Sequence, residues 1–241
     1  KMSWHRSSRT YHKWLMLFVG LQFVIWSISG AYMVLLDIDY IHGDSLVIKH
    51  QAPLNSEQIN YPIAQLYTDH PDAENLVLTT LLGNAVYRFS EGKAKYLLSA
   101  DTGKLLSPIN EADAKQIAKH KYAKRNAKVT HVSMVIDNPP RELNARHLPV
   151  WRVDFDDFAS PSFYISVESG ELVTKRHSFW RLFDWMFSFH VMDYIEEDAS
   201  NKLLLIVTLS GLIASLFGFV LTYFRVFRTK KNRQNKIKQG E

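Results

Sequence analysis

The chain has 241 residues, a formal net charge of +5 and no cysteine. The absence of thiols excludes disulfide bonds, thiolate metal sites, a catalytic cysteine and covalent c-type haem attachment, which needs a Cys-x-x-Cys-His motif. The sequence also lacks a glycine-rich phosphate loop, a nucleophile elbow and a His-Glu-x-x-His zinc motif. It therefore predicts no self-contained hydrolase or nucleotide enzyme.

Two long apolar segments, 14–36 and 203–224, contain no ionised side chain. Each is long enough to cross a bilayer core, which takes roughly 20 helical residues. The alternative for the first segment is a secretory signal peptide, but the apolar core of such a peptide has only about 7–15 residues. The sequence therefore predicts two transmembrane helices that flank the central part of the chain.

Positive charges lie outside these two segments, and acidic residues lie just inside them. The tails, 1–13 and 225–241, carry eleven Lys and Arg residues against one acid, a net charge of +10, which leaves −5 for the rest of the chain. Because Lys and Arg accumulate on the cytoplasmic side of a membrane, we expect both termini in the cytoplasm and the centre in the periplasm, at a bacterial inner membrane. The basic tails then indicate membrane lipids as partners, and not nucleic acid.

The central segment contains an internal repeat. Residues 96–106 (YLLSADTGKLL) match residues 163–173 (FYISVESGELV) as a strand, an acid, a small hydroxyl residue, a glycine and a second strand. Gly103 and Gly170 are expected to take the positive φ of a hairpin turn. Upstream of each turn the pattern predicts a helix and two strands, at 62–70, 76–78 and 85–89 in the first copy and 112–126, 129–136 and 149–153 in the second. Each copy should form an antiparallel sheet with a helix over one face, so the predicted fold class is α+β.

A helix followed by a meander that ends in strand-Asp-x-x-Gly-x-Leu resembles the PepSY domain, here in two copies at 58–108 and 111–174 after a linker at 37–57. The opening Tyr-His-Lys-Trp at 11–14 and the segment 180–194 resemble the PepSY-associated transmembrane proteins. The resemblance implies a component of an electron-transfer or iron–siderophore/flavin reductase system that meets a periplasmic redox protein or an iron chelate. The alternative it implies is a non-enzymatic accessory, assembly or protease-regulating subunit.

The same resemblance places histidines at His12 and His190, where a neutral imidazole can ligate b-type haem. The alternatives are an interfacial residue for His12 and a packing residue in an aromatic helix for His190. His12 is expected at the cytoplasmic end of the first span and His190 before the second. About 30 Å of hydrocarbon should separate them, so one haem cannot use both within a protomer.

Residues 178–195 are predicted to form an amphipathic helix on the membrane surface, because apolar residues recur there at three- and four-residue spacing. Arg181 and Asp184 are spaced to pair along this helix. The residues expected at the membrane or partner interface are Trp180, Arg181, Trp185, Phe187 and Tyr194.

Two further groups in the second repeat have both a binding and a structural interpretation. The aromatic group is a candidate for stacking a flavin, a less favoured cofactor than haem, or for packing a sheet core; it comprises Trp151, Phe155, Phe158, Phe163 and Tyr164. The acids Asp154, Asp156 and Asp157 are candidates for a cation or for a solvated hairpin end, which the lack of calcium-loop spacing favours.

Small residues in the apolar segments predict close helix contacts. Gly211 and Gly218 are one heptad apart and share a helix face. Gly20, Ser27, Ser29 and Gly30 provide a similar patch on the first segment. These patches favour a homo-oligomer or a larger membrane-protein complex.

Overall fold

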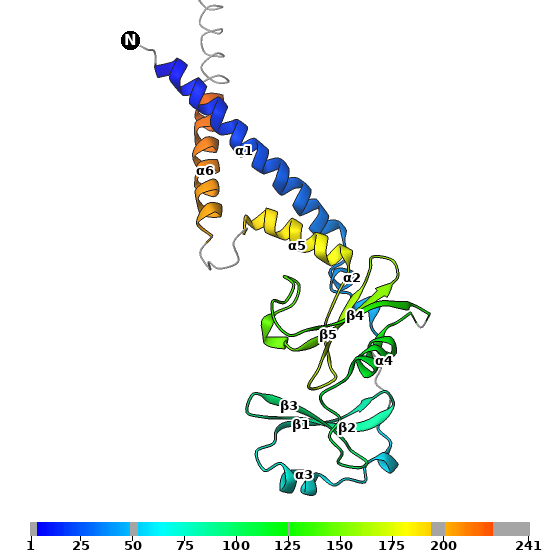
Figure 1. Cartoon of the computed structure of the whole chain (residues 1–241). Coiled ribbons are helices and arrows are strands. Elements are labelled where there is room, and N and C mark those ends of the chain that lie inside the picture. The colour runs from blue at the N-terminus through cyan, green and yellow to red at the C-terminus, as the bar shows by residue number, and fades with distance from the viewer. Residues whose placement is uncertain (1–3, 49–52, 125, 194–200, 224–241) are drawn as a thin grey trace, which may run out of the picture. The chain divides into compact units, whose positions relative to one another are not determined.

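The structure is a computed structural model that describes residues 4–48, 53–124, 126–193 and 201–223 (Figure 1). Within these ranges the fold is α+β, with two antiparallel sheets and two helices long and apolar enough to cross a membrane. The predicted fold class is confirmed at this level. The chain divides into two compact units, Lys1–Leu35 with Phe183–Glu241, and Leu36–Leu182.

The helical unit is built from three elements: α1 (Trp4–Leu35), the part of α5 (Ser178–Val191) that begins at Phe183, and α6 (Lys202–Tyr223). A Cβ atom added to Gly211 would lie 3.8 Å from Val19, and one added to Gly218 would lie 3.8 Å from His12. One heptad of α1 therefore matches one heptad of α6 in the opposite direction. The two helices are antiparallel. Both glycines lie on one face of α6, as predicted, and this face contacts α1 of the same chain.

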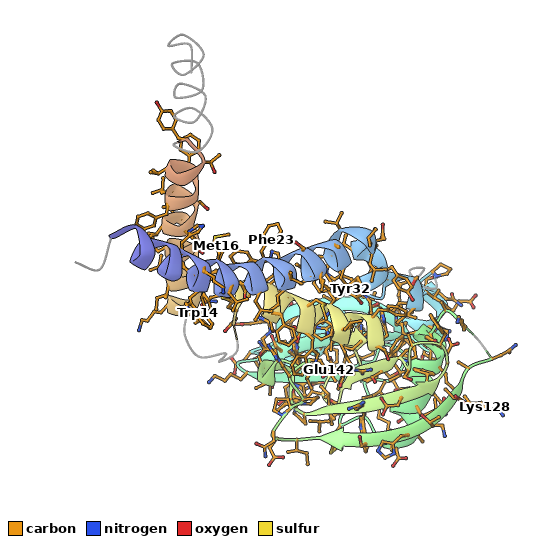
Figure 2. The ribbon with its side chains drawn as sticks, turned by 90° about the horizontal axis from the view of Figure 1, so that it is seen from above. Trp14, Met16, Phe23, Tyr32, Lys128 and Glu142 are labelled. Atoms are coloured by element: carbon orange, nitrogen blue, oxygen red, sulfur yellow. The ribbon has the colours of Figure 1, made fainter. Side chains whose placement is uncertain are left out.

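The outer surface of these two helices is apolar. The spans His12–Leu35 and Lys202–Val220 have mean hydropathies of 1.7 and 2.5. Trp14, Met16 and Phe23 project from α1 and are 64%, 43% and 66% exposed (Figure 2). Exposure of so large an apolar surface to water is unfavourable, so the apolar outer surface of α1 and α6 is compatible with insertion into a membrane.

The second unit contains two successive helix-and-sheet repeats. The first sheet has the order β1-β2-β3, and the second has the order β4-β5-β6-β7. A short helix, α2 (Ile38–Ile41), precedes them. The first repeat comprises α3 (Ile63–Asp69), β1 (Glu74–Leu81), β2 (Asn84–Glu91) and β3 (Ala94–Ser99). The second comprises α4 (Glu111–Lys121), β4 (Lys128–Val135), β5 (Val150–Asp156), β6 (Ser162–Ser166) and β7 (Leu172–Arg176).

The turns of the two repeats have the same backbone geometry. Gly103 and Gly170 have φ values of 68° and 65°, in the left-handed region that glycine tolerates best. The Gly103 N–H donates to Ser99 O at 2.9 Å, and the Gly170 N–H donates to Ser166 O at 3.0 Å. The predicted pair of equivalent hairpins is confirmed. After the first turn, however, the chain forms only an isolated bridge between Leu98 and Leu105, whereas the second turn leads into a full strand, β7.

The residue two positions before each repeat's helix is held by an equivalent hydrogen bond. The Tyr61 N–H donates to Ala100 O at 2.9 Å ahead of α3, and the Ile109 N–H donates to Val167 O at 2.7 Å ahead of α4. The prediction that the second helix continues to Asn126 is wrong, since α4 ends at Lys121. Tyr122 leaves the helix to form a bridge with Val47, and this pairing with the linker replaces the next helical turn.

The two repeats share one hydrophobic core. Leu81, Val86 and Leu97 of the first repeat belong to the same buried cluster as Phe155 and Phe163 of the second. Burial of apolar surface on both sides of the junction therefore stabilises the tandem as one body. A smaller cluster beneath α3 is contributed by Leu66, Ala85, Tyr87, Phe89, Leu98 and Ala100.

Candidate functional site

His190 lies in the last turn of α5 against α1. Its Nδ1 atom is 2.9 Å from Ser29 Oγ, and the indole Nε1–H of Trp26 donates to the His190 carbonyl oxygen at 2.7 Å. A Cβ atom added to Gly30 would lie 3.6 Å from the imidazole ring. The small residues Ser29 and Gly30 therefore allow the ring to approach the α1 backbone, and Trp26 fixes the end of α5 beside it.

The hydrogen bonds of Ser29 indicate which nitrogen of a neutral His190 carries the proton. A serine hydroxyl has one proton, and Ser29 donates it to Ile25 O at 2.8 Å, within its own helix. Ser29 Oγ then accepts the second hydrogen bond, so the proton of neutral His190 is assigned to Nδ1. This leaves the lone pair on Nε2, which is the form of an imidazole that ligates a metal.

The second histidine expected from the sequence lies at the other end of α1. His12 contacts α6 at Gly218, and its buried Nδ1 atom has no hydrogen-bond partner among the residues that the structure describes. Because His190 contacts Ser29, the two imidazoles are separated by seventeen helical residues, about 25 Å along α1. The residues therefore fit one axial haem ligand at His190 and do not fit a pair within one chain.

The predicted interface residues of α5 fall on both sides of the boundary between the two units, which divides this helix between Leu182 and Phe183. Trp180 packs against the Arg176 guanidinium, which lies 4.0 Å from the ring centroid. Trp180 and Arg181 both belong to the unit Leu36–Leu182, which contains the two repeats and is called the repeat domain. Trp185 and Phe187 are 57% and 48% exposed. Tyr194 lies outside the described residues.

Arg181 forms an ion pair with Glu142, a partner that the sequence did not indicate. Its Nε–H donates to Glu142 Oε2 at 2.6 Å, and its second guanidinium nitrogen donates to Ser162 Oγ at 2.8 Å. Burial tends to raise the pKa of Glu142, but hydrogen bonds from Arg181 and Tyr164 and the nearby guanidinium charges hold it below its ordinary value. This half-buried network attaches the first turn of α5 to the second sheet.

The candidate aromatic and acidic groups of the second repeat have structural contacts. Phe155, Phe163 and Tyr164 are 3% exposed or less, so they pack the core and offer no open face to a flavin. Asp154 pairs with Arg152, and Asp157 pairs with Lys124. Across the described ranges, no group of three or more His, Cys, Asp or Glu residues is arranged to hold a metal ion.

No protein-family model, curated protein or solved structure matches this chain. The candidate site therefore rests on the geometry of its own residues. Sequence reasoning selected His190 but missed its partners Trp26 and Ser29, as well as the role of Glu142. Ser29 is one of several small residues on α1, and nothing local distinguishes it as a hydrogen-bond partner for a residue 161 positions away.

Proposed function

We propose that the chain is an inner-membrane-anchored periplasmic component of an electron-transfer or iron–siderophore/flavin reductase system, built on two PepSY-like repeats. The two apolar antiparallel helices support anchoring, and the basic tails support a periplasmic location for the repeats. The observation that carries an electron-transfer role is the imidazole of His190, whose Nδ1–H is held by Ser29 while Nε2 is an acceptor.

A b-type haem held by His190 would provide one-electron transfer. The second axial ligand would come from another copy of the chain or from a partner protein, because His12 is about 25 Å away along α1. Ser29 would orient the imidazole in the way that outer hydrogen-bond partners orient metal-ligating histidines.

The experiment is an absorption spectrum of the full chain, purified in detergent after expression with ample haem and recorded before and after chemical reduction. We expect a sharp band at the blue edge of the visible range that shifts on reduction. His190→Ala should remove the band while the protein still inserts. His131→Ala, at an exposed position on β4, is the matched control and should keep it.

The second candidate is a non-enzymatic accessory, assembly or protease-regulating subunit of a membrane complex. It is favoured by the finding that the described residues contain no clustered metal-ligand group. A colourless wild-type protein, or a band that persists in His190→Ala, contradicts haem at this histidine and favours this second function.

A further inference from the structure

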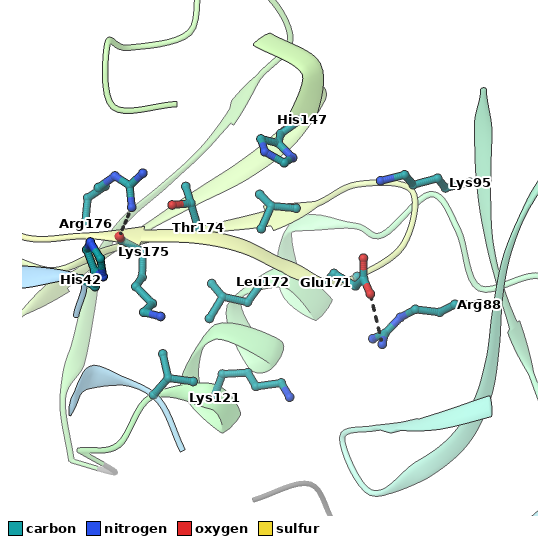
Figure 3. Close-up of a pocket in the computed structure, with 13 residues that line it drawn as sticks. His42, Arg88, Lys95, Lys121, His147, Glu171, Leu172, Thr174, Lys175 and Arg176 are labelled. Atoms are coloured by element: carbon teal, nitrogen blue, oxygen red, sulfur yellow. Dashed lines mark hydrogen bonds and ion pairs between the residues drawn. The ribbon is translucent and has the colours of Figure 1, made fainter. Parts of the chain in front are cut away.

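A pocket with a volume of about 590 Å³ lies in the repeat domain, lined by residues of both repeats (Figure 3). Arg88 and Lys95 come from the first sheet, Lys121 from the end of α4, and Lys175 and Arg176 from β7. In Figure 3 the side chains gather around Leu172 from these separate elements. The tandem arrangement thus brings together cations that are far apart in the sequence.

Arg88 is held in place across the junction of the repeats. Its Nε–H donates to Ser169 O at 2.8 Å in the second turn, and its guanidinium lies 3.8 Å from Glu171. The Arg88 side chain is only 15% exposed, whereas that of Glu171 is 49% exposed. An arginine fixed by backbone and carboxylate contacts loses little conformational freedom when it binds a further anion.

The lining is strongly cationic. It contains five Lys and Arg residues and a single acid, Glu171. Lys175 is paired with Asp44 at 2.7 Å, but in the described part of the chain Lys95 and Lys121 have no ion-pair partner. Positive charge therefore exceeds negative charge inside the pocket.

Burial and neighbouring charge both act on the cations of the pocket. Burial lowers the pKa of Lys121, and the positive charge of Arg88 lowers it further, against the opposing charge of Glu171. Burial also lowers the pKa of Arg88, against the favourable charge of Glu171. A bound anion would relieve both the desolvation and the mutual repulsion of these cations.

The pocket also has apolar lining, from Val47, Leu172 and Val173. Its volume lies in the range of small-molecule sites, about 300–1,000 Å³. A lining that combines several cations with aliphatic side chains suits an organic molecule with more than one acidic group, because each group can meet a separate Lys or Arg.

We propose that this pocket binds a soluble organic anion that carries two or more phosphate or carboxylate groups. Lys121 and Lys95, from different repeats, are the cations available to it, and Arg88 is a third cation, held in place by Ser169 and Glu171. The site belongs to the repeat domain alone, so it depends neither on haem nor on His190.

The test uses the full chain in phosphatidylcholine nanodiscs, titrated calorimetrically with pyrophosphate and with citrate. We expect saturable binding of at least one probe with a Kd of about 1 mM or below. Lys121→Gln should weaken binding about tenfold, because a charge-assisted hydrogen bond is lost. Lys119→Gln, an exposed position on the same helix, should leave binding unchanged.

Two further variants test the proposal if Lys121→Gln fails to fold. Lys95→Gln changes an exposed side chain on β3 and should also weaken binding, while its neighbour Lys93→Gln should not. Glu171→Gln removes the one acid of the lining, while Arg88 keeps its shorter hydrogen bond to Ser169 O. This variant should therefore tighten binding, which loss of a structural residue would not do. The proposal is overturned if neither probe binds at about 1 mM. It is also overturned if the control variants weaken binding as much as the pocket variants, or if only an acidic peptide such as polyglutamate binds.

Discussion

The Nδ1 atom of His190 and the Oγ atom of Ser29 form a hydrogen bond of 2.9 Å that joins α5 to α1 across 161 positions of the chain. Together with the bond from Trp26 Nε1 to the His190 carbonyl, it fixes the last turn of α5 on α1. We assign the serine proton to the hydrogen bond with Ile25 O, which makes the imidazole the donor in this pair.

We therefore predict that neutral His190 carries its proton on Nδ1. Nitrogen NMR of the full chain with labelled histidine, at a pH of about 8, should show the Nδ1–H tautomer for this residue. Ser29→Ala should remove the acceptor and shift the population toward the commoner Nε2–H form. A signal for Nε2–H in the wild-type protein would contradict the assignment.

A second prediction concerns the register of α1 and α6. The sequence has no cysteine, so any disulfide that forms must come from the introduced cysteine pair. Val19→Cys with Gly211→Cys should form a disulfide under mild oxidation in membranes, because a Cβ atom on Gly211 would lie 3.8 Å from Val19. Val19→Cys with Gly218→Cys is the matched control, displaced by one heptad or about 10 Å along α6, and should remain reduced. Equal yields for the two pairs would rule out this antiparallel register.

A third prediction separates two consequences of adding a methyl group to a turn glycine. Gly92 and Gly103 both have positive φ, but an added Cβ meets nothing within 4 Å at Gly92 and lies 2.5 Å from the Tyr61 ring at Gly103. Gly92→Ala should cost about 1–2 kcal/mol of unfolding free energy through backbone strain alone. Gly103→Ala should cost more, because the ring must also move, and circular dichroism melts of the full chain in detergent would measure the difference. A smaller loss for Gly103→Ala would contradict the packing of this turn.

The fourth prediction concerns His177, which is 2% exposed and hydrogen-bonded through Nε2 to Tyr40 O. Burial lowers its pKa below the ordinary value of 6.5, and the charges of Arg181 and Arg176 add to this effect, against the hydrogen bond that the imidazole donates to Tyr40 O. The unfolded chain then binds the proton more tightly than the folded chain does. The stabilising contribution is complete above about pH 6.5 and is lost as the pH falls from there through the lowered pKa.

Melting temperatures of the full chain between about pH 7 and pH 5 test this point. They should fall with pH in the wild type and fall less in His177→Gln, which has no titratable group at this position. His131→Gln changes an exposed histidine and should retain the wild-type slope. An unchanged slope in His177→Gln would mean that other groups dominate in this range.

The features that depend on local pattern could be predicted from the sequence. Strands with a period of two, and glycines beside a small hydroxyl residue, indicated both hairpins because turn chemistry is local. Gly103 and Gly170 consequently have the expected φ values. The apolar segments and the shared face of Gly211 and Gly218 were equally accessible, because helical spacing alone determines which residues share a face.

The features that depend on tertiary contacts could not be predicted. The helix at 112–126 was expected to continue, but pairing of Tyr122 with Val47 ends it at Lys121. Arg181 is spaced to meet Asp184, yet the fold brings Glu142 to it from a distant loop. Lys121 is the last residue of α4, where a lysine interacts favourably with the negative end of the helix dipole. Because a lysine is common at such a position, no motif marks Lys121 as a pocket residue.

The proposed function depends most on two membrane crossings that leave both tails in the cytoplasm and the tandem repeats in the periplasm. The direct measurement is a pair of fusions to a reporter enzyme that is active only in the periplasm, one after Ser107 and one after Arg228. We predict activity for the fusion after Ser107, within the repeat domain, and none for the fusion after Arg228, in the basic tail. Activity after Arg228, or its absence after Ser107 with the fusion protein present in the membrane, would contradict the proposed topology.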